Sequence, residues 1–487
     1  MDAALICYSD FYPHLTDGMC LSNFRKYGLT FAVGMLTFAA LGRIQAAPEV
    51  TSIWGGARGT VVKKSDGTVW TWGANFGGKL GIGMASTNLG RVLIPTEVHG
   101  PGNSDFLNSV SAIMGGEVHN VALKYDGTVW SWGNNVFGQI GSGTTNDASA
   151  PVQTSGLSSV IALGGRGYHT LAIEGDGSVW GWGWNSAGEL GDGTTNRTTV
   201  PVRVIGLANP AAVSAGYKFS IALMTNGTVF QWGHGRVIAN SFNPVQVPGL
   251  SNILAISSGW DHALALRSDH TVWTWGQNNY GEIGDGSALN RTNPVQVMTT
   301  ISAPLSNIVA VSGGDWHSSA LDSSGTIWKW GRNDTGQLGN GTADSSQHPL
   351  PVKILLDTNG DPFTNIVLMA ARDYHNIAVK GDGSVCQWGA NDQGQCGVGT
   401  TNDLHRPSPV IGLGARTPLT LNLGRNIQPG LADLSWSSAT GQYFAIEYTT
   451  SLANRFIGGQ SNILATPPTN IVSVPATNSS YFYRLRF

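Results

Sequence analysis

One short motif recurs seven times along the chain. Each copy follows the pattern of DGTVWTWG, which ends at Gly73, or SGTIWKWG, which ends at Gly331. The second tryptophan of successive copies stands at Trp72, Trp132, Trp182, Trp232, Trp275, Trp330 and Trp388, which gives a period of 43 to 60 residues. Periods of this size are typical of arrays in which each repeat is one supersecondary unit that cannot bury its hydrophobic face alone. The chain must therefore fold by packing its repeats against one another.

Each repeat predicts four short β-strands. An opening strand such as VIALGG from Val160 is followed by a second strand such as HTLAIEG, and an Asp-Gly turn then leads into the W-x-W-G strand. A loop of the type GELGDG and a Pro-Val strand complete the repeat. Closing seven such sheets into a ring covers their faces and leaves only short edges. The predicted fold is all-β, a seven-bladed β-propeller over residues 48–413.

Composition supports this interpretation and limits the class of partner. The chain has 66 Gly and 12% charged residues, compared with about 25% charged residues in an average soluble protein. Twelve of its 17 Trp lie in the repeated motifs, where two Trp separated by one residue project from the same side of a strand and predict core packing. A formal net charge of -3 argues against nucleic-acid binding, which needs clustered Lys and Arg.

These combined motifs resemble the regulator of chromosome condensation repeat family, whose units carry a G-x-x-H-T-x-A-L strand, D-G-x-V-W-x-W-G and G-Q-L-G-x-G. The resemblance covers seven units, from about Pro48 to Leu413, and implies a propeller that acts by binding. The founding member of the family is a nuclear nucleotide-exchange factor for a small GTPase. Exported bacterial relatives, including a β-lactamase inhibitory protein, resemble this chain more closely in setting.

The first 47 residues are predicted to be a leader that includes a signal peptide. Arg25 and Lys26 precede an apolar stretch, and Ala46-Ala47 offers a cleavage site with small residues. The apolar stretch is shorter than the 18 or more residues that a spanning helix requires. The mature chain is therefore expected to be secreted or held at the cell surface, without a membrane span, and the resemblance to exported bacterial relatives implies a bacterial source.

The last 74 residues lack the repeat. Residues 414–487 contain LADLSW, YFAIEYTTSL and YFYRLRF, which alternate like strands, and resemble a small fibronectin type III-like β-sandwich.

Two cysteines of the last repeat replace large apolar residues. Cys386 takes the place of the first Trp of its motif, and Cys396 takes the place of Leu in G-Q-L-G. Since an exported protein can form disulfides, a Cys386–Cys396 bridge is predicted, and two buried thiols are the alternative.

A histidine recurs at the start of the second strand, and its residues are His119, His169, His262, His317 and His375. A catalytic His belongs to one asymmetric site, whereas repetition in five of seven units predicts a hydrogen-bonded structural role. Gly59 and Phe219 occupy the same place in the first and fourth repeats.

The residues just before this register are predicted to form a binding face. They lie in the turns between the first and second strands and combine Trp, Tyr and Arg with carboxylates, which is the chemistry of protein-binding hot spots. The predicted partner-binding residues are Arg58, Glu117, Arg166, Tyr168, Tyr217, Lys218, Trp260, Asp261, Asp315, Trp316, Arg372, Asp373 and Tyr374. Ordinary exposed turns are the alternative interpretation.

The function that follows is non-catalytic recognition of a protein partner outside the cytoplasm. A glycan-binding or cell-surface structural module is the second interpretation, and a hydrolase with a site in the propeller channel is the third. No cofactor is expected, and no metal site, because the loop DTNGDP from Asp357 lacks the later acidic ligand of a calcium loop. The fourth repeat lacks the G-x-L-G-x-G loop after Gly233, which predicts a shortened blade with a notch or simple decay of the repeat.

Overall fold

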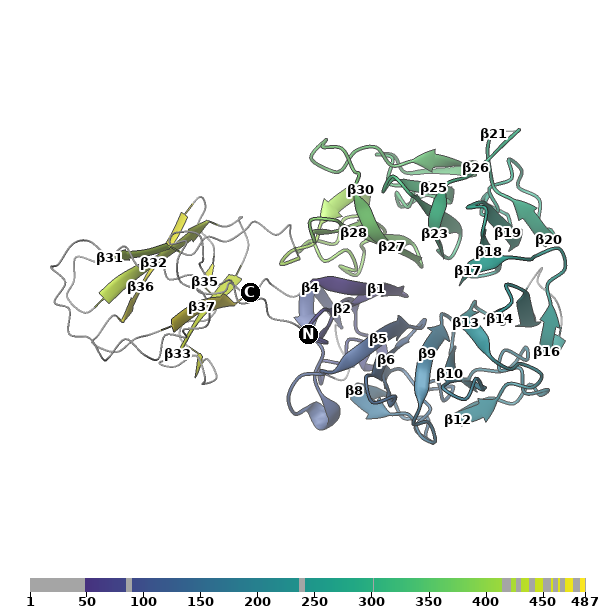
Figure 1. Ribbon diagram of the computed structural model, residues 1–487, viewed down its shortest axis with the longest axis horizontal. Helices are drawn as coiled ribbons and strands as arrows, with labels where there is room; N and C mark the ends of the chain where they lie inside the picture. The colour runs from purple at the N-terminus through teal and green to yellow at the C-terminus, as the bar shows by residue number, and fades with distance from the viewer. Residues whose placement is uncertain are drawn as a thin grey trace, which may run out of the picture. The chain divides into compact units, whose positions relative to one another are not determined.

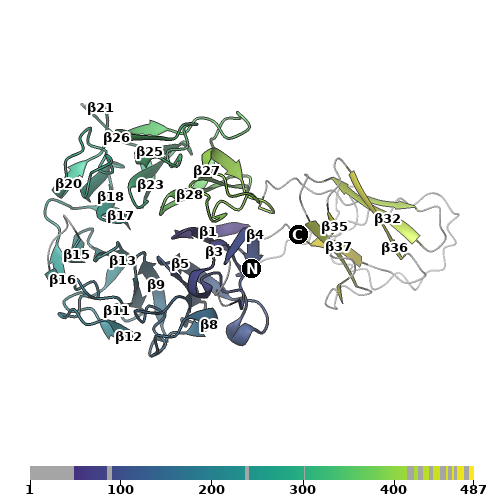
Figure 2. The same ribbon diagram turned by 180° about the vertical axis from the view of Figure 1, so that it is seen from behind.

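The computed structural model describes residues 49–84, 90–235, 241–300 and 302–413, together with strands between 422 and 486. The predicted leader, residues 1–47, lies outside the described residues. Within 49–413 the chain forms seven four-stranded antiparallel sheets, each built from strands that are consecutive in sequence. The seven-bladed β-propeller is therefore confirmed. Figure 1 shows the blades arranged in a ring, with the first strand of each blade nearest the centre, and Figure 2 shows the same arrangement from behind.

The strands occupy equivalent places in all seven blades. The first strands are β1 (Val50–Gly56), β5 (Val110–Gly115), β9 (Val160–Gly165), β13 (Pro210–Ala215), β17 (Ile253–Ser258), β23 (Ile308–Gly313) and β27 (Ile366–Arg372). The second strands are β2 (Gly59–Lys64), β6 (His119–Lys124), β10 (His169–Glu174), β14 (Phe219–Met224), β18 (His262–Arg267), β24 (His317–Asp322) and β28 (His375–Lys380). The third strands are β3 (Val69–Ala74), β7 (Val129–Gly133), β11 (Val179–Gly183), β15 (Val229–Gly233), β19 (Val272–Gly276), β25 (Ile327–Asn333) and β29 (Val385–Gly389). The outer strands are β4 (Arg91–Glu97), β8 (Ala148–Gln153), β12 (Thr198–Arg203), β16 (Ser241–Gln246), β20 (Arg291–Gln296), β26 (Asp344–Lys353) and β30 (Leu404–Pro409).

Short elements interrupt this pattern between the blades. They are the 3-10 turns η1 (Phe76–Gly78) and η2 (Pro101–Asn103) and the hairpin of β21 (Met298–Thr300) and β22 (Ala303–Pro304). In the loop from Asp357, the carboxylate of that residue accepts hydrogen bonds from the backbone N–H groups of Asn359 and Asp361, which makes it a turn-capping residue. None of the described residues forms a helix that is both long and apolar enough to cross a membrane.

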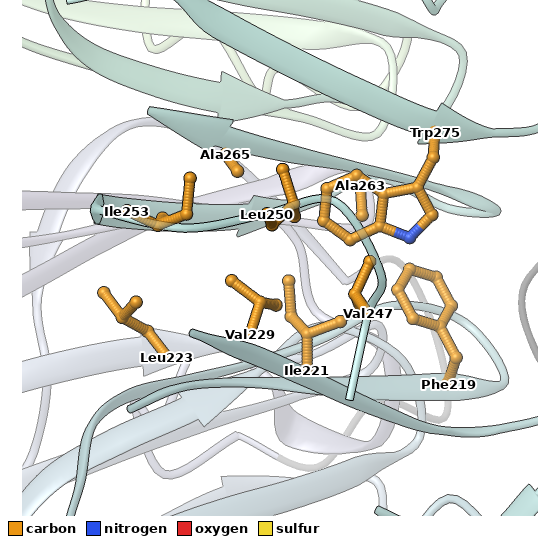
Figure 3. Close-up of a cluster of buried hydrophobic side chains, with 10 residues drawn as sticks. All are labelled: Phe219, Ile221, Leu223, Val229, Val247, Leu250, Ile253, Ala263, Ala265 and Trp275. Atoms are coloured by element: carbon orange, nitrogen blue, oxygen red, sulfur yellow. The ribbon is translucent and has the colours of Figure 1, made fainter. Parts of the chain in front are cut away.

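The hydrophobic core lies between neighbouring blades. Figure 3 shows the cluster between the fourth and fifth blades, which consists of Phe219, Ile221, Leu223, Val229, Val247, Leu250, Ile253, Ala263, Ala265 and Trp275. The second tryptophan of every repeat, such as Trp275, is fully buried in a cluster of this kind. The prediction that these tryptophans pack between blades is confirmed.

A polar unit accompanies five of the seven apolar clusters. In the gap between the third and fourth blades, His169 Nε2 lies 2.8 Å from Ser220 Oγ, which donates at 2.8 Å to the carbonyl oxygen of Glu189. The indole N–H of Trp232 donates to the same carbonyl at 2.8 Å. Equivalent imidazole contacts join His119 to Thr170, His262 to Ser318, His317 to Asn376 and His375 to Thr60. The predicted structural role of the repeated histidine is therefore confirmed.

The ring closes through side chains and not through a shared strand. All four strands of the first blade precede those of the last, and Trp72 of the first blade donates to Gln387 Oε1 and to the carbonyl of Gln395, both at 2.9 Å. Thr60 Oγ1 lies 3.1 Å from His375 Nε2 and accepts from Gln387 Nε2 at 2.8 Å. The junction between the first and last blades thus uses the same polar unit as four of the other gaps.

The predicted disulfide is wrong, because Cys386 and Cys396 are both free and buried. Cys386 packs in the cluster between the sixth and seventh blades. The residues that flank Cys396 face the first blade instead: Gln395 accepts from Trp72, and Gly397 lies against the same indole. The two thiols therefore lie on opposite sides of the seventh blade. Burial raises the pKa of Cys386 to about 12, so the alternative interpretation of two buried thiols holds.

Beyond Leu413 the structure describes seven further strands. They are β31 (Asn422–Arg425), β32 (Leu431–Ser437), β33 (Tyr443–Thr449), β34 (Ile457–Gly458), β35 (Ile463–Leu464), β36 (Thr469–Pro475) and β37 (Phe482–Arg486). One antiparallel sheet has the order β31-β32-β36, and β33 pairs with β34, β35 and β37. The packing of these sheets lies outside the described residues, so the fibronectin type III-like sandwich of 414–487 stays a prediction.

Candidate functional site

The turns between the first and second strands of all blades lie on one side of the propeller, which we call the turn face. The glycine that ends each W-x-W-G motif packs closely against the turn between the first and second strands. At Gly183 the backbone φ is 103°, and a Cβ there would lie 2.6 Å from the carbonyl oxygen of Tyr168. The next residue, Trp184, donates its backbone N–H to that carbonyl at 2.9 Å. Because the same bond occurs in every blade, the loop after the third strand begins beside the turn.

Five of the predicted residues form a continuous row of aromatic side chains, which we call the aromatic row. It runs through consecutive blades and consists of Tyr168, Tyr217, Trp260, Trp316 and Tyr374, all half-buried. Tyr217 and Trp260 stack with ring centroids 4.0 Å apart and an interplanar angle of 12°. The other neighbours lie 6.0, 6.1 and 5.1 Å apart. Lys218 Nζ lies 5.5 Å from the ring centre of Tyr217, which places this predicted residue at the same surface.

Side chains from the loops after the third strands extend the aromatic row outward. Phe137 and Trp184 flank Tyr168 at 5.4 and 5.6 Å between ring centroids. Tyr280 lies 6.2 Å from Trp316, and the Arg332 guanidinium lies over both rings and over Tyr374. The sequence prediction missed these residues. The sequence contained a signal for them. The third strand of each blade runs back toward the turn between the first and second strands, so the loop that follows the third strand must also lie on the turn face.

Five predicted contact residues are buried instead of exposed. They are Arg166, Asp261, Asp315, Arg372 and Asp373, with exposed fractions of 2% to 6%. The expectation that these five side chains lie exposed in their turns is therefore wrong, and their contact with a partner stays a prediction. Their side chains turn into the ring, because a short turn can direct only some of its side chains outward.

The buried arginines join distant blades at the centre of the turn face. Arg166 donates to the carbonyls of Ser258 and Gly313 at 2.8 and 2.6 Å. It also pairs with Asp315 at 2.6 Å. Arg372 donates to the carbonyls at the ends of β5 and β9 and stacks on the ring of Trp54 at 4.8 Å. These contacts anchor the same turns that carry the aromatic row.

The last two predicted residues, Arg58 and Glu117, lie in the first and second blades, where the aromatic row is absent. Together with four neighbours they line a pocket of about 180 Å³. The backbone of Arg58 is left-handed, with φ of 52°, and its N–H donates to the Asp373 carboxylate at 2.9 Å. In this pocket the charged side chains of Arg58, Lys79 and Glu117 lie beside the aromatic ring of Phe76.

The turn face offers aromatic rings and neutral hydroxyl groups to a ligand. Burial raises the pKa of Tyr168 to about 12, so this phenol stays protonated and offers a neutral donor and acceptor. The five repeated imidazoles are buried in the blade gaps. Among the described residues, no group of three or more His, Cys, Asp or Glu side chains could hold a metal ion.

Comparison with protein families gives matches over the propeller. The model described as RCC1-like domain matches residues 167–427. Models of the regulator of chromosome condensation (RCC1) repeat match 66–123 and 126–173, and a second such model matches 109–139.

Curated relatives align over single stretches of their length. Human E3 ubiquitin-protein ligase HERC2 is 32% identical over 135 residues, which is 28% of this chain and 3% of HERC2. Ultraviolet-B receptor UVR8 of Arabidopsis thaliana is 34% identical over 131 residues, 27% of this chain and 28% of UVR8. The chain thus spans less than a third of these relatives.

Solved structures match over most of the chain. The structure of Prp20p from Saccharomyces cerevisiae has a TM-score of 0.59 and 23% identity, and covers 71% of this chain and 86% of that one. Yeast RCC1 (Prp20) with Kap60 bound gives a TM-score of 0.60 and 22% identity, with coverage of 79% and 91%. At this identity the likeness shows the fold.

Proposed function

The chain belongs to the RCC1-like domain family, whose model matches more than half of its residues, and from this premise we propose that it is a non-catalytic scaffold that binds a protein partner through the turn face. Prp20p is described by its binding properties to Gsp1p and histones, and yeast RCC1 by its complex with Kap60. Protein binding is therefore a known use of this fold, although a fold alone does not determine a function.

The observation that carries the proposal is the aromatic row. Trp, Tyr and Arg dominate the energetics of protein interfaces, because large rigid side chains bury much area with little loss of conformational entropy. Here Tyr217, Trp260 and Trp316 contact one another, and Arg332 covers the outer side. Half-buried rings that already pack against their neighbours lose little further freedom on binding.

The setting of this function is part of the proposal. We infer that the protein acts outside the cytoplasm, since Arg25, Lys26 and the apolar stretch before Ala46 have the order of a signal peptide. The resemblance to exported bacterial binding proteins supports this setting. Amino-terminal sequencing of the exported protein tests it, and a mature chain that begins well before Ala46 would contradict cleavage.

The proposal is tested by capture of partners from native surface and culture extracts. The bait is the full chain, compared with a Trp260→Ala, Trp316→Ala, Tyr374→Ala variant. We expect one specific protein to be lost from the variant's catch. It should bind the purified wild-type chain directly and the variant at least about 100-fold more weakly, because three contact residues of about 1–2 kcal/mol each are removed.

A matched control uses exposed residues at the opposite ends of the same first strands. Leu254, Val309 and Val367 are 56%, 46% and 53% exposed, and their replacement by Ala should leave the catch unchanged. Both variants must keep the wild-type unfolding midpoint. Identical catches from wild type and the aromatic variant would refute the turn face as the interface. Retention on polysaccharide that is competed by free sugar would instead favour the glycan-binding alternative, which the same rings could serve.

A further inference from the structure

The pocket in the first and second blades interrupts the aromatic surface. Its volume is about 180 Å³, and its lining consists of Ala57, Arg58, Phe76, Lys79, Glu117 and Val118. Phe76 is 61% exposed at the rim, and Lys79 is 2% exposed in the wall. The pocket therefore combines an apolar edge with ionisable groups in a space that one amino-acid side chain can fill.

Local changes in the repeat create this pocket. The first blade has Gly59 where five blades have the buried histidine, and Ala57 stands near the place of the aromatic residues. Lys79 stands where the other loops have Gln or Glu, and its Nζ donates to the carbonyls of Ala57 and Glu117 at 2.9 and 2.8 Å. The lysine thus occupies part of the space that a histidine fills elsewhere, and the remainder stays open.

The pocket presents donors to a ligand. Among the described residues, the two carbonyls use two of the three N–H donors of the Lys79 ammonium group, which leaves one for a ligand. The Arg58 guanidinium lies at the mouth, 3.6 Å from Asp392, with both side chains about half exposed. Such an exposed pair is worth at most about 1 kcal/mol, so Arg58 is free to turn toward a ligand.

We propose that this pocket binds a carboxylate side chain, from an Asp or Glu of the protein partner that the aromatic row holds. This inference rests on the proposed function, because the carboxylate belongs to the protein partner that is proposed there. Two cations against one carboxylate in the lining favour an anionic ligand. A Lys or Arg of the partner would approach Arg58 and Lys79, and a purely apolar side chain would leave both of them without a counter-charge.

The charge of the pocket depends on pH near neutrality. Burial lowers the pKa of Lys79 to about 8, while Glu117 and Asp373 oppose this and Arg372 adds to it. Burial also raises the pKa of Glu117 to about 7; Asp315 adds to this, and Lys79, Arg166 and Arg372 oppose it. As the pH falls from 8.5 to 6, the ammonium group gains its charge and the carboxylate loses its own. A bound carboxylate favours both protonated forms, so binding takes up protons and strengthens as the pH falls.

The test uses a small probe and the full-length chain. N-acetyl-glutamate N-methylamide is titrated at pH 6 and pH 8.5, and binding is followed by the NMR signals of the methyl groups of Ala57 and Val118. The isosteric glutamine derivative and the cationic lysine derivative serve as control ligands. We expect saturable shifts with the glutamate probe alone, and about tenfold tighter binding at pH 6, since a shift of one pKa unit in one linked group corresponds to a factor of ten.

Two variants identify the groups involved. Arg58→Gln should weaken probe binding about fivefold or more at both pH values, because it removes the exposed cation. Arg91→Gln is its matched control, since Arg91 donates to the backbone of Asp392 nearby and does not line the pocket. Glu117→Gln should bind the glutamate probe at least as tightly as wild type at pH 7, because the repelling carboxylate is gone.

The outcomes separate this inference from the function on which it rests. Preference for the lysine probe, loss of binding in Glu117→Gln, or no methyl shift with any probe at either pH would each overturn the carboxylate pocket. None of these results depends on a partner. The capture experiment would therefore still test, independently, whether the aromatic row is the protein interface. A successful probe titration with no partner captured would conversely uphold the pocket and refute the larger interface.

Discussion

At the scale of single residues, the turn face is held by side chains that do not reach its surface. Arg166 lies two residues before Tyr168, Asp315 directly precedes Trp316, and these two charged groups pair beneath the aromatic row. Arg372 stands two residues before Tyr374 and is fixed by carbonyls of β5 and β9. Each buried charge thus positions an aromatic neighbour in its own turn. A surface that is anchored in this way is preorganised for binding, which reduces the entropy lost on association.

The Arg166–Asp315 pair leads to a stability prediction. Arg166→Ala should lower the free energy of unfolding by about 3–5 kcal/mol, because Asp315 then remains buried without a counter-charge and two carbonyls lose their donor. Arg267→Ala removes a pair with Asp269 whose side chains are 30% and 47% exposed, and should cost no more than about 1 kcal/mol. Urea unfolding of both variants measures the difference. Equal midpoints would contradict a structural role for the buried pair.

The site residues could be predicted only in part from the sequence. Tyr217 and Trp260 were found because turn residues can be counted from the repeated histidine register. Arg166 and Asp373 were assigned to the same surface because their turns are the same, but the direction of a side chain in a short turn depends on partners in other blades. Arg166 finds its partner 149 residues away in the sequence, and no repeat pattern contains that information.

At the scale of elements, the fourth blade shows how the polar unit depends on its loop. This blade lacks the G-x-L-G-x-G sequence, which in the third blade supplies the Glu189 carbonyl that accepts from Trp232. Phe219 replaces the histidine and Ala263 replaces its hydroxyl partner, so both sides of the contact are apolar. The buried indole N–H of Trp275 donates instead to Gln231 Oε1 at 2.9 Å. The whole unit has changed together, because a buried donor without an acceptor is costly.

A matched pair of substitutions tests this dependence. Gln231→Leu should cost about 1–3 kcal/mol, because the N–H of Trp275 loses its acceptor in a buried gap. Gln387→Leu should cost less, since Trp72 keeps its second acceptor, the carbonyl of Gln395. Unfolding midpoints give the energies, and hydrogen exchange of the two indole N–H groups locates the effect. A larger loss for Gln387→Leu would show that the loop carbonyl is not the dominant acceptor.

Element positions followed from the repeat, whereas pairings across the blades did not. The alternation and turn residues of VIALGG, HTLAIEG and W-x-W-G are sufficient to predict β9, β10 and β11. The Cys386–Cys396 bridge failed because proximity in one blade says nothing about which side of the sheet each residue faces. The notch expected in the fourth blade stays a prediction, since residues 236–240 lie outside the described part of the chain.

At the scale of the whole molecule, the ring and its five buried imidazoles form one titrating system. His375 contributes to the junction that closes the ring, and the others join the gaps between consecutive blades. Burial lowers the pKa of His119, His169, His262 and His375 to about 3, and that of His317 well below its ordinary value. Below pH 6.5 the unfolded chain therefore takes up protons that the folded ring does not bind, and stability falls.

Buried carboxyl groups oppose this loss over part of the range. Burial raises the pKa of Glu117 and Glu282 to about 7, and it also raises the pKa of Glu189 and of Asp373. These groups bind protons in the folded ring before they do so in the unfolded chain, so they add stability as the pH falls toward about 4.5. Below that pH the unfolded chain is protonated at its carboxyl groups as well, and the histidines act without opposition.

We therefore expect stability to change little between pH 6.5 and 4.5 and to collapse below it, at about 7 kcal/mol per pH unit for the five histidine protons. Aspartates whose hydrogen bonds lower their pKa, such as Asp176 and Asp344, add to this loss. Since a domain has about 5–15 kcal/mol in total, unfolding should be complete near pH 3. Urea midpoints measured at half-unit steps of pH test this. The control is His262→Phe with Ser318→Ala, which copies the natural Phe219–Ala263 contact and should reduce the steep slope by one proton. A steady decline from pH 6.5, or an unchanged slope in that variant, would mean that the imidazoles are not the groups that couple the blades to pH.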